Sequence, residues 1–167
     1  YRRRMEVLGV DVRLGTRAEA ADLAAYAQVV VATGVVPRIP DLPGIDHPSV
    51  VSYADLLEGA VVAGPNVAVI GAGGIGVDVA HFLTHDPDEG LAEWLAHWGV
   101  GDPATHRGGL VEPTPRRTTR QVTLLQRKDT PIGIGLGKTS GWAHRAVLKQ
   151  SGVRTIPGVT YDRIDDA

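Results

Sequence analysis

The sequence predicts an α/β fold built on a parallel β-sheet, and two observations carry this prediction. From residue 67 onward, short runs of apolar residues alternate with stretches of helical periodicity, in the order strand, helix, excursion, strand, helix, strand. One of these strands runs directly into a glycine-rich turn that opens a helix. Both features are typical of a βαβαβ half of a doubly wound sheet.

The elements of this half start with the strongest strand signal of the chain, at residues 67–70. A helix is expected from about residue 74 to 83, because its apolar residues fall on one face at helical spacing. An excursion over about 85–120 follows, with a helix at 91–98 and then many Gly, Pro, Thr and Arg residues. The remaining expected elements are strands at 122–126, 153–156 and 159–164 and a helix at 140–150.

The beginning of the chain predicts a piece of a second domain. This part is expected to contain a helix over 1–9, a strand at 10–14 and a short helix or turn at 18–25. A strand buried on both faces is expected at 28–32. Four prolines between 37 and 48 remove backbone donors and predict an extended connection. Ser52 is expected to cap a short helix through Leu57. The predicted domains are residues 1–58, a partial domain with its linker, and residues 59–167.

Composition excludes several classes of function. The chain of 167 residues has a formal net charge of −2, which gives no reason to expect nucleic acid or an anionic membrane as partner. It contains no cysteine, and therefore no disulfide, thiolate metal site or cysteine nucleophile. No stretch is apolar for long enough to cross a bilayer, and the basic N-terminus lacks the apolar region of a signal peptide. We expect a cytoplasmic setting and a piece of a longer protein.

The sequence Gly71-Ala72-Gly73-Gly74-Ile75-Gly76 matches the pattern G-x-G-x-x-G. Gly71 permits the tight turn out of the strand, Gly73 leaves room for a pyrophosphate, and Gly76 lets helix and strand pack closely. The free N–H groups and the positive dipole end of the following helix attract phosphate. The sequence therefore predicts a Rossmann-like, three-layer dinucleotide-binding domain with Gly71, Gly73, Gly74, Ile75 and Gly76 at the cofactor.

The end of the next strand indicates which dinucleotide is bound. An acid that binds the ribose is expected about 20 residues past the glycines, and Glu93 near that distance lies in a helical pattern. If the excursion displaces the second strand to 122–126, the residues at its end are Gln126, Arg127 and Lys128. Two cations there favour a 2′-phosphate and hence NADPH over NADH. The alternative is that both are solvated loop charges.

Three further patterns are interpreted as structural. Residues 137–139 read Gly-Lys-Thr, but a P-loop needs a glycine where the chain has Ile132. His81 and His85 have a spacing that can hold a metal, yet no third ligand is evident, so a solvated polar face is favoured and no metal is expected. The arginines at 116, 117 and 120 lack interleaved aromatic residues and favour a solvated loop over a nucleic-acid site.

A second motif carries a family resemblance. Residues 29–34 read Val-Val-Val-Ala-Thr-Gly and lead into Pro37-Arg38, Pro40 and Pro43-Gly44. This segment resembles the connection of two-dinucleotide-domain flavoproteins from an FAD domain into an inserted NAD(P)H domain. Together with the blocks at 44–48, 52–53, 71–76, 125–128 and 136–142, nearly the whole chain resembles the C-terminal part of bacterial NADPH-dependent 2,4-dienoyl-CoA reductases.

The resemblance implies that NADPH binds here for hydride transfer to FAD, in the β-oxidation of unsaturated fatty acids. Thr33 and Gly34 would lie near a partial FAD site. FMN, the 4Fe–4S cluster, the barrel and the first FAD glycine loop are expected only in the missing part of the full-length chain, which would be this fragment's partner. No catalytic residue is expected in the fragment, which alone should be inactive.

Two other functions stay open at the level of the sequence. The first is a module of a related, trimethylamine dehydrogenase-like flavoprotein that holds an adenine nucleotide without NADPH turnover. The intact glycine loop and the pair Arg127 and Lys128 favour the reductase over this module. The second is a P-loop ATPase, which the imperfect Gly-Lys-Thr pattern supports only weakly.

Overall fold

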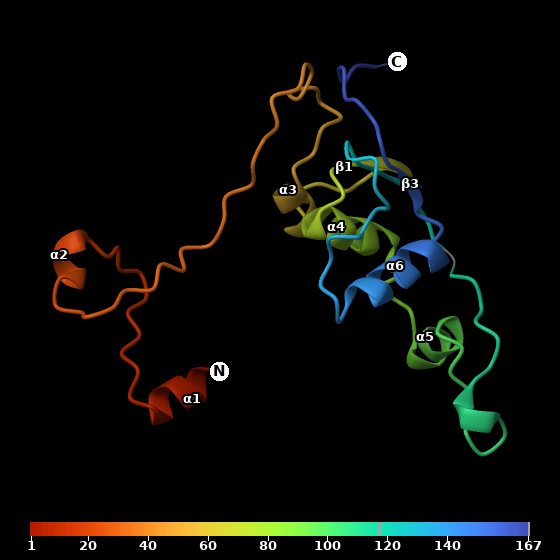
Figure 1. Cartoon of the computed structure of the whole chain (residues 1–167), viewed down its shortest axis with the longest axis horizontal. Coiled ribbons are helices and arrows are strands. Elements are labelled where there is room, and N and C mark those ends of the chain that lie inside the picture. Colours follow the sequence, from red (N-terminus) through yellow and green to blue (C-terminus); the bar gives the residue numbers. More distant parts are fainter. Residues whose placement is uncertain (117, 167) are drawn as a thin grey trace. The chain divides into compact units, whose positions relative to one another are not determined.

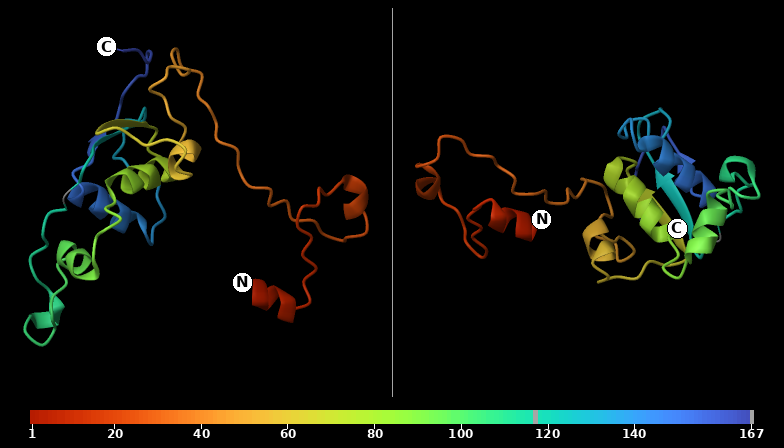
Figure 2. Two further views of the ribbon diagram at one scale, coloured as in Figure 1. Left: turned by 180° about the vertical axis from the view of Figure 1, so that it is seen from behind. Right: turned by 90° about the horizontal axis from the view of Figure 1, so that it is seen from below.

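The computed structural model describes residues 1–116 and 118–166 of the chain (Figures 1 and 2). Contacts divide it into two compact units, Tyr1–Val36 and the remainder from Pro37 onward. Each unit is described by itself below. The division predicted from the sequence, between residues 58 and 59, stays a prediction.

A parallel sheet of three strands forms the centre of the unit that begins at Pro37 (Figure 1). Its strands are β1 (Asn66–Ile70), β2 (Gln121–Leu125) and β3 (Arg154–Ile156), in the spatial order β1-β2-β3. All three were expected from the sequence, and their parallel pairing confirms the α/β fold. Because β1 and β2 are in register over their whole length, with Ile70 opposite Leu125, their carboxyl ends meet at one edge of the sheet.

Four helices accompany this sheet: α3 (Tyr53–Leu57), α4 (Gly74–Thr84), α5 (Leu91–His97) and α6 (Gly141–Gln150). Helix α4 packs against β1, β2 and α6 (Figure 2), and α3 packs against α4. Ser52 caps α3 as expected, because its Oγ accepts the Asp55 N–H at 3.1 Å.

Apolar side chains between α4, α6 and the sheet form the core. Leu83 and Leu124, 2% and 0% exposed, are among its largest members. The other buried members are Val77, Val79, Ala80, Val122, Ile132, Leu148 and Val153. The opposite face of β1 is exposed at Asn66, Ala68 and Ile70, so the described helices cover one face of this strand. No helix in the described part of the chain is long and apolar enough to cross a membrane.

The excursion between α4 and β2 is irregular, as expected. After α5 the chain makes a single antiparallel bridge between Val100 and Leu110, and a short 3₁₀ turn, η1 (Arg107–Gly109), lies inside it. The remaining residues up to β2 form no further helix or strand among those described. The excursion therefore separates β1 and β2 in sequence without changing their pairing.

The unit Tyr1–Val36 contains two helices, α1 (Arg2–Val7) and α2 (Ala20–Leu23). The strands predicted at 10–14 and 28–32 are wrong for this structure, because no described segment pairs with either of them. Val30 and Val31 of this apolar run are 88% and 80% exposed, because no neighbouring strand covers them. The strand predicted at 159–164 is wrong for the same reason: Val159 and Ile164 donate single hydrogen bonds to Gln126 and Pro43 without forming a ladder.

The closest approach between strand and helix is at Gly76. A Cβ built there would lie 1.8 Å from the carbonyl oxygen of Gly71, far inside van der Waals contact. Gly71 itself has φ +103°, a conformation that side-chain-bearing residues rarely adopt. The structure thus confirms the conformational tasks predicted for both glycines, and it fixes the start of α4 against the end of β1.

We expect Gly76→Ala to lower the free energy of unfolding by about 1–3 kcal/mol or more, because its Cβ collides with backbone that cannot move aside. Gly74→Ala is the matched control, since nothing lies within 4 Å of a Cβ at that position. It should change stability by only about 1 kcal/mol or less. Urea denaturation of both variants measures the difference, and equal stabilities would contradict the packing argument.

Candidate functional site

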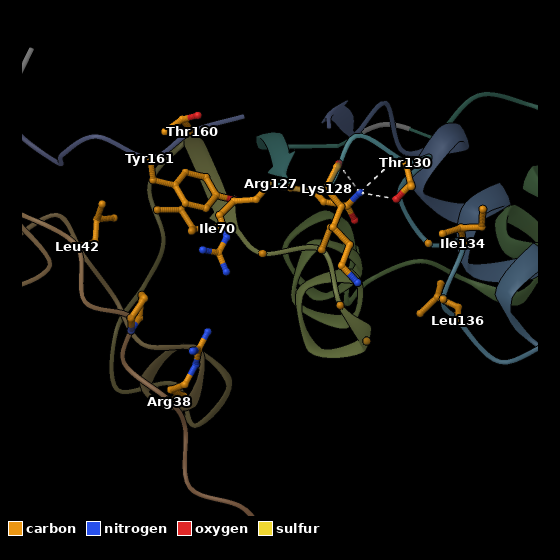
Figure 3. Close-up of a pocket in the computed structure, with 18 of the residues that line it drawn as sticks. Arg38, Leu42, Ile70, Arg127, Lys128, Thr130, Ile134, Leu136, Thr160 and Tyr161 are labelled. Carbon is orange, nitrogen blue, oxygen red and sulfur yellow. Dashed lines mark hydrogen bonds between the residues drawn. The ribbon is translucent and has the colours of Figure 1, made fainter. Parts of the chain in front are cut away.

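A cavity of about 780 Å³ lies at the carboxyl ends of β1 and β2 (Figure 3). Four segments of the unit from Pro37 onward line it. They are the connection at 38–42, the end of β1 with the glycine loop at 70–74, the loop at 126–136, and residues 160–161. In open α/β sheets, ligands bind at this edge, outside the carboxyl ends of the strands.

The glycine loop supplies the floor of this cavity. Gly71, Gly73 and Gly74 line it, and nothing lies within 4 Å of a Cβ built on Gly73 or Gly74. No side chain caps α4 at its N-terminus, where Gly73 stands in the capping position. The first N–H groups of α4 therefore have no partner within their own helix and can donate to an anion. Of the two other predicted residues, neither Ile75 nor Gly76 is part of the cavity wall.

The loop after β2 brings Arg127 and Lys128 to the same cavity (Figure 3). Gln126 holds this loop, because its side-chain amide donates to the carbonyl oxygens of Lys128 and Thr130 at 2.9 and 2.8 Å. The Lys128 carbonyl also accepts the N–H of Gly158 at 3.1 Å. Neither cation forms a salt bridge with any residue that the structure describes, so both charges face the cavity uncompensated. The sequence pattern did not reveal the bracing role of Gln126.

Two further residues of the wall were not predicted as site residues, Arg38 and Tyr161. The Tyr161 hydroxyl is buried and has no hydrogen-bond partner among the described residues. Burial raises the pKa of Tyr161, while the charge of Arg127 and the backbone at Gly71 act in the opposite direction. Tyr161 lies in the segment expected as a strand, and nothing in the sequence marked it as a site residue. Arg38 lies in the proline-rich motif, which drew attention to that segment without assigning Arg38 to the site.

Thr33 and Gly34 belong to the unit Tyr1–Val36 and not to the one that contains the cavity. Both are exposed, and Gly34 has φ +79°. Their predicted position near FAD stays a prediction.

The Gly-Lys-Thr segment at 137–139 does not contribute to the cavity wall. Instead it forms the turn before α6: the Gly141 N–H donates to the Gly137 carbonyl at 2.7 Å, and the Trp142 indole N–H donates to the Thr139 carbonyl at 3.0 Å. Its role in the described structure is therefore to start a helix.

The interpretation of the arginine cluster as a solvated loop is wrong for two of its members. The side chain of Arg116 is 6% exposed and lies 3.6 Å from the Glu89 carboxylate, which also contacts His97 at 2.5 Å. Arg120 reaches the carbonyls of Ala63 and Leu83 at 3.4 Å. Arg116 thus joins two parts of the excursion, and Arg120 ties the end of the excursion to the rest of the unit. Local composition reveals neither contact. Arg117 lies outside the described residues.

His81 is half-buried on α4 rather than solvated, which corrects the interpretation for this residue, whereas His85 is exposed as expected. Burial, followed by the charge of Arg116, lowers its pKa below the ordinary value of 6.5, with smaller contributions from His85 and His144 in the same direction and Asp78 against it. Within residues 1–116 and 118–166, no three His, Cys, Asp or Glu side chains gather as a metal site would require.

Comparison with known proteins defines the family. The profile of the pyridine nucleotide-disulphide oxidoreductases matches residues 2–167. The chain belongs to the pyridine nucleotide-disulphide oxidoreductase family. Domains of this family bind FAD and NAD(P), and this pyridine nucleotide-disulphide oxidoreductase domain has the parallel sheet and glycine loop that such binding requires.

The relatives that match the chain are named as reductases and dehydrogenases. The chain is 26% identical to a metal reductase of Desulforamulus reducens, with 92% of the chain and 23% of the relative aligned. It is 29% identical to the nitric oxide reductase FlRd-NAD(+) reductase of Aeromonas hydrophila, over 95% of the chain and 34% of the relative. An N,N-dimethylglycine/sarcosine dehydrogenase of Chromohalobacter salexigens is 32% identical over 79% of the chain and 20% of the relative.

A solved structure of a 2-naphthoyl-CoA reductase in complex with 2-naphthoyl-CoA is similar over 99% of the chain. The TM-score is 0.61, the sequence identity is 25%, and 20% of that protein is covered. The chain thus spans between 20% and 34% of the length of these four proteins.

The lowered pKa of His81 predicts a pH dependence of stability. The unfolded chain takes up a proton near pH 6.5, whereas the folded chain resists it to lower pH. The free energy of unfolding should therefore fall as the pH drops below about 6.5, until the folded-state pKa is passed. His81→Gln should flatten this fall, and His106→Gln, at an exposed position, should not. Urea titrations between pH 8 and 5 measure both, and an unchanged slope in His81→Gln would contradict the burial argument.

Proposed function

We infer that this pyridine nucleotide-disulphide oxidoreductase domain binds NADPH for hydride transfer to FAD in a larger flavoprotein reductase. The observation that carries the proposal is the common cavity of the glycine loop and the two cations after β2. Gly71, Gly73 and Gly74, with the first N–H groups of α4, would hold the pyrophosphate. Arg127 and Lys128 would hold the 2′-phosphate, and Ile75 and Gly76 would support the loop from behind.

The contribution of this chain is binding and orientation. When bound, the nicotinamide and the flavin supply the hydride chemistry. The glycine loop fixes one end of the dinucleotide against β1, and the loop braced by Gln126 fixes the other. Thr33 and Gly34 would contribute to the flavin side of the same reaction. An iron–sulphur cluster would be held by other segments of the full-length protein, because this chain has no cysteine to ligate one. FMN is assigned to the missing part by the family resemblance alone.

The more specific proposal is a 2,4-dienoyl-CoA reductase acting in β-oxidation, in the cytoplasm. The blocks quoted from the sequence support it, and so does the similarity to a solved reductase of another acyl-CoA. The relatives named for metal, nitric oxide reductase and dimethylglycine chemistry show that the family carries other substrates on similar domains.

The alternative is a domain that holds an adenine nucleotide without NADPH turnover. The dehydrogenase of methylated glycines among the relatives favours it, since its name places it in amine oxidation. The open space over Gly73 and the two uncompensated cations at the end of β2 favour the NADPH-binding domain. The two functions differ in a measurable quantity, the preference for NADPH over ADP and NADH.

Arg127→Ala should weaken NADPH binding by about tenfold or more, because a charge-assisted contact to the 2′-phosphate is lost. NADH lacks that phosphate, so its affinity should stay nearly unchanged. Isothermal titration calorimetry of the chain measures both. Arg154→Ala is the control, since Arg154 is exposed on β3 and does not line the cavity. Equal affinities for NADPH and NADH in the unsubstituted chain would remove the NADPH assignment and favour the alternative.

Gly73→Ala should weaken NADPH and NADH alike. The new methyl group meets no protein atom within 4 Å, so folding should be retained, but it fills space over the loop where the pyrophosphate would lie. Calorimetric titration gives the affinities, and a thermal melt checks the fold. Unchanged affinity for both nucleotides would refute pyrophosphate binding at this loop.

A further inference from the structure

We propose that Arg38, on the proline-rich connection, binds the pyrophosphate of the dinucleotide from the side of the cavity opposite Lys128. This residue would complete a phosphate site whose other donors belong to the glycine loop. The proposal rests on the function inferred above. It adds a binding residue from the proline-rich connection, which was expected only to link two domains.

The connection is held firmly enough to keep Arg38 at the cavity. Leu42 is 7% exposed, and its carbonyl accepts the Ile45 N–H at 3.0 Å. The Pro43 carbonyl accepts the Ile164 N–H at 2.9 Å. Gly44 lies so close to Ile164 that a Cβ would stand 2.0 Å from its carbonyl oxygen. The segment that follows Arg38 is therefore pinned to the same unit that carries the glycine loop.

The side chain of Arg38 points into the cavity from its own side. In Figure 3, Arg38 and Leu42 lie on one side of the cavity, Lys128 and Thr130 lie on the other, and Arg127 lies between them. The guanidinium groups of Arg38 and Arg127 point toward one another. The glycine loop, where the pyrophosphate is expected, lines the same cavity.

The charges of this wall favour an anion. Arg38, Arg127 and Lys128 all line the cavity, and the only carboxylate among the described lining residues is Asp41. None of the three cations forms a salt bridge with a described residue. Like charges in one cavity repel, whereas a phosphate bound by the Arg38 guanidinium accepts charge-assisted hydrogen bonds from it. Arginine is suited to this role because its planar fork matches phosphate oxygens.

We assign Arg38 to the pyrophosphate rather than to the 2′-phosphate. The 2′-phosphate is assigned to the loop after β2, and Lys128 of that loop points in from the side away from Arg38 (Figure 3). A group bound by Arg38 and the glycine loop together is one that NADPH and NADH share. The expected signature is therefore an equal loss of affinity for both nucleotides.

Calorimetric titration of the 167-residue chain with NADPH and with NADH tests the proposal. Arg38→Ala should weaken both by about tenfold, and Arg38→Lys should recover part of the loss. Arg154→Ala removes the same charge away from the cavity and should weaken neither beyond a small electrostatic effect. Thermal melts should coincide, because Arg38 forms no hydrogen bond or salt bridge with the described residues.

The other outcomes each overturn a stated part. Unchanged affinities in Arg38→Ala, with Arg127→Ala still losing NADPH selectively, would refute the role of Arg38 and leave the proposed function standing. A loss confined to NADPH would place Arg38 at the 2′-phosphate and refute the pyrophosphate assignment. Equal losses in Arg38→Ala and Arg154→Ala would mean that only overall charge matters. No binding of either nucleotide by the unsubstituted chain would overturn both proposals.

Discussion

The packing of Gly76 against the carbonyl of Gly71 is the constraint on which the rest of the site depends. It brings the first turn of α4 so close to the end of β1 that no side chain fits between them. The turn at Gly71 is possible only in a left-handed conformation, which glycine adopts at little cost. Together, Gly71 and Gly76 place the free N–H groups of α4 at the carboxyl edge of the sheet, where Gly73 and Gly74 leave the space open.

The other parts of the site are segments far apart in the sequence that reach the same edge. The excursion inserts a long stretch between β1 and β2, yet the strands pair in full register, so the loop after β2 arrives beside the glycine loop. Arg116 joins two parts of the excursion through Glu89, and Arg120 attaches the end of the excursion to the carbonyl of Leu83 on α4. The connection that carries Arg38 is fastened separately, through its contact with Ile164.

Much of this arrangement could be predicted from the sequence, because its signals are local. Strand β1, helix α4 and the roles of Gly71 and Gly76 follow from one continuous motif, and the turn residues of that motif determine the backbone directly. The errors arise where structure depends on distant partners. The run at 28–32 is apolar enough for a buried strand, but a strand exists only with a neighbour to bond. Likewise, no local pattern indicates that Arg116 is buried against Glu89 or that Arg38 and Tyr161 reach the cavity.

The most direct test of the account is to observe which backbone amides respond when NADPH binds. Heteronuclear NMR of the 15N-labelled chain, titrated with NADPH, should show its largest shifts at the amides of Gly73, Gly74 and Gly76, followed by those of Arg127 and Lys128. This pattern would place the dinucleotide on the glycine loop with its phosphates at the start of α4. A second cavity lies in the excursion, where Glu93, His97 and Arg116 are among its lining residues. Saturable shifts confined to that cavity, with the glycine amides unmoved, would contradict the central claim.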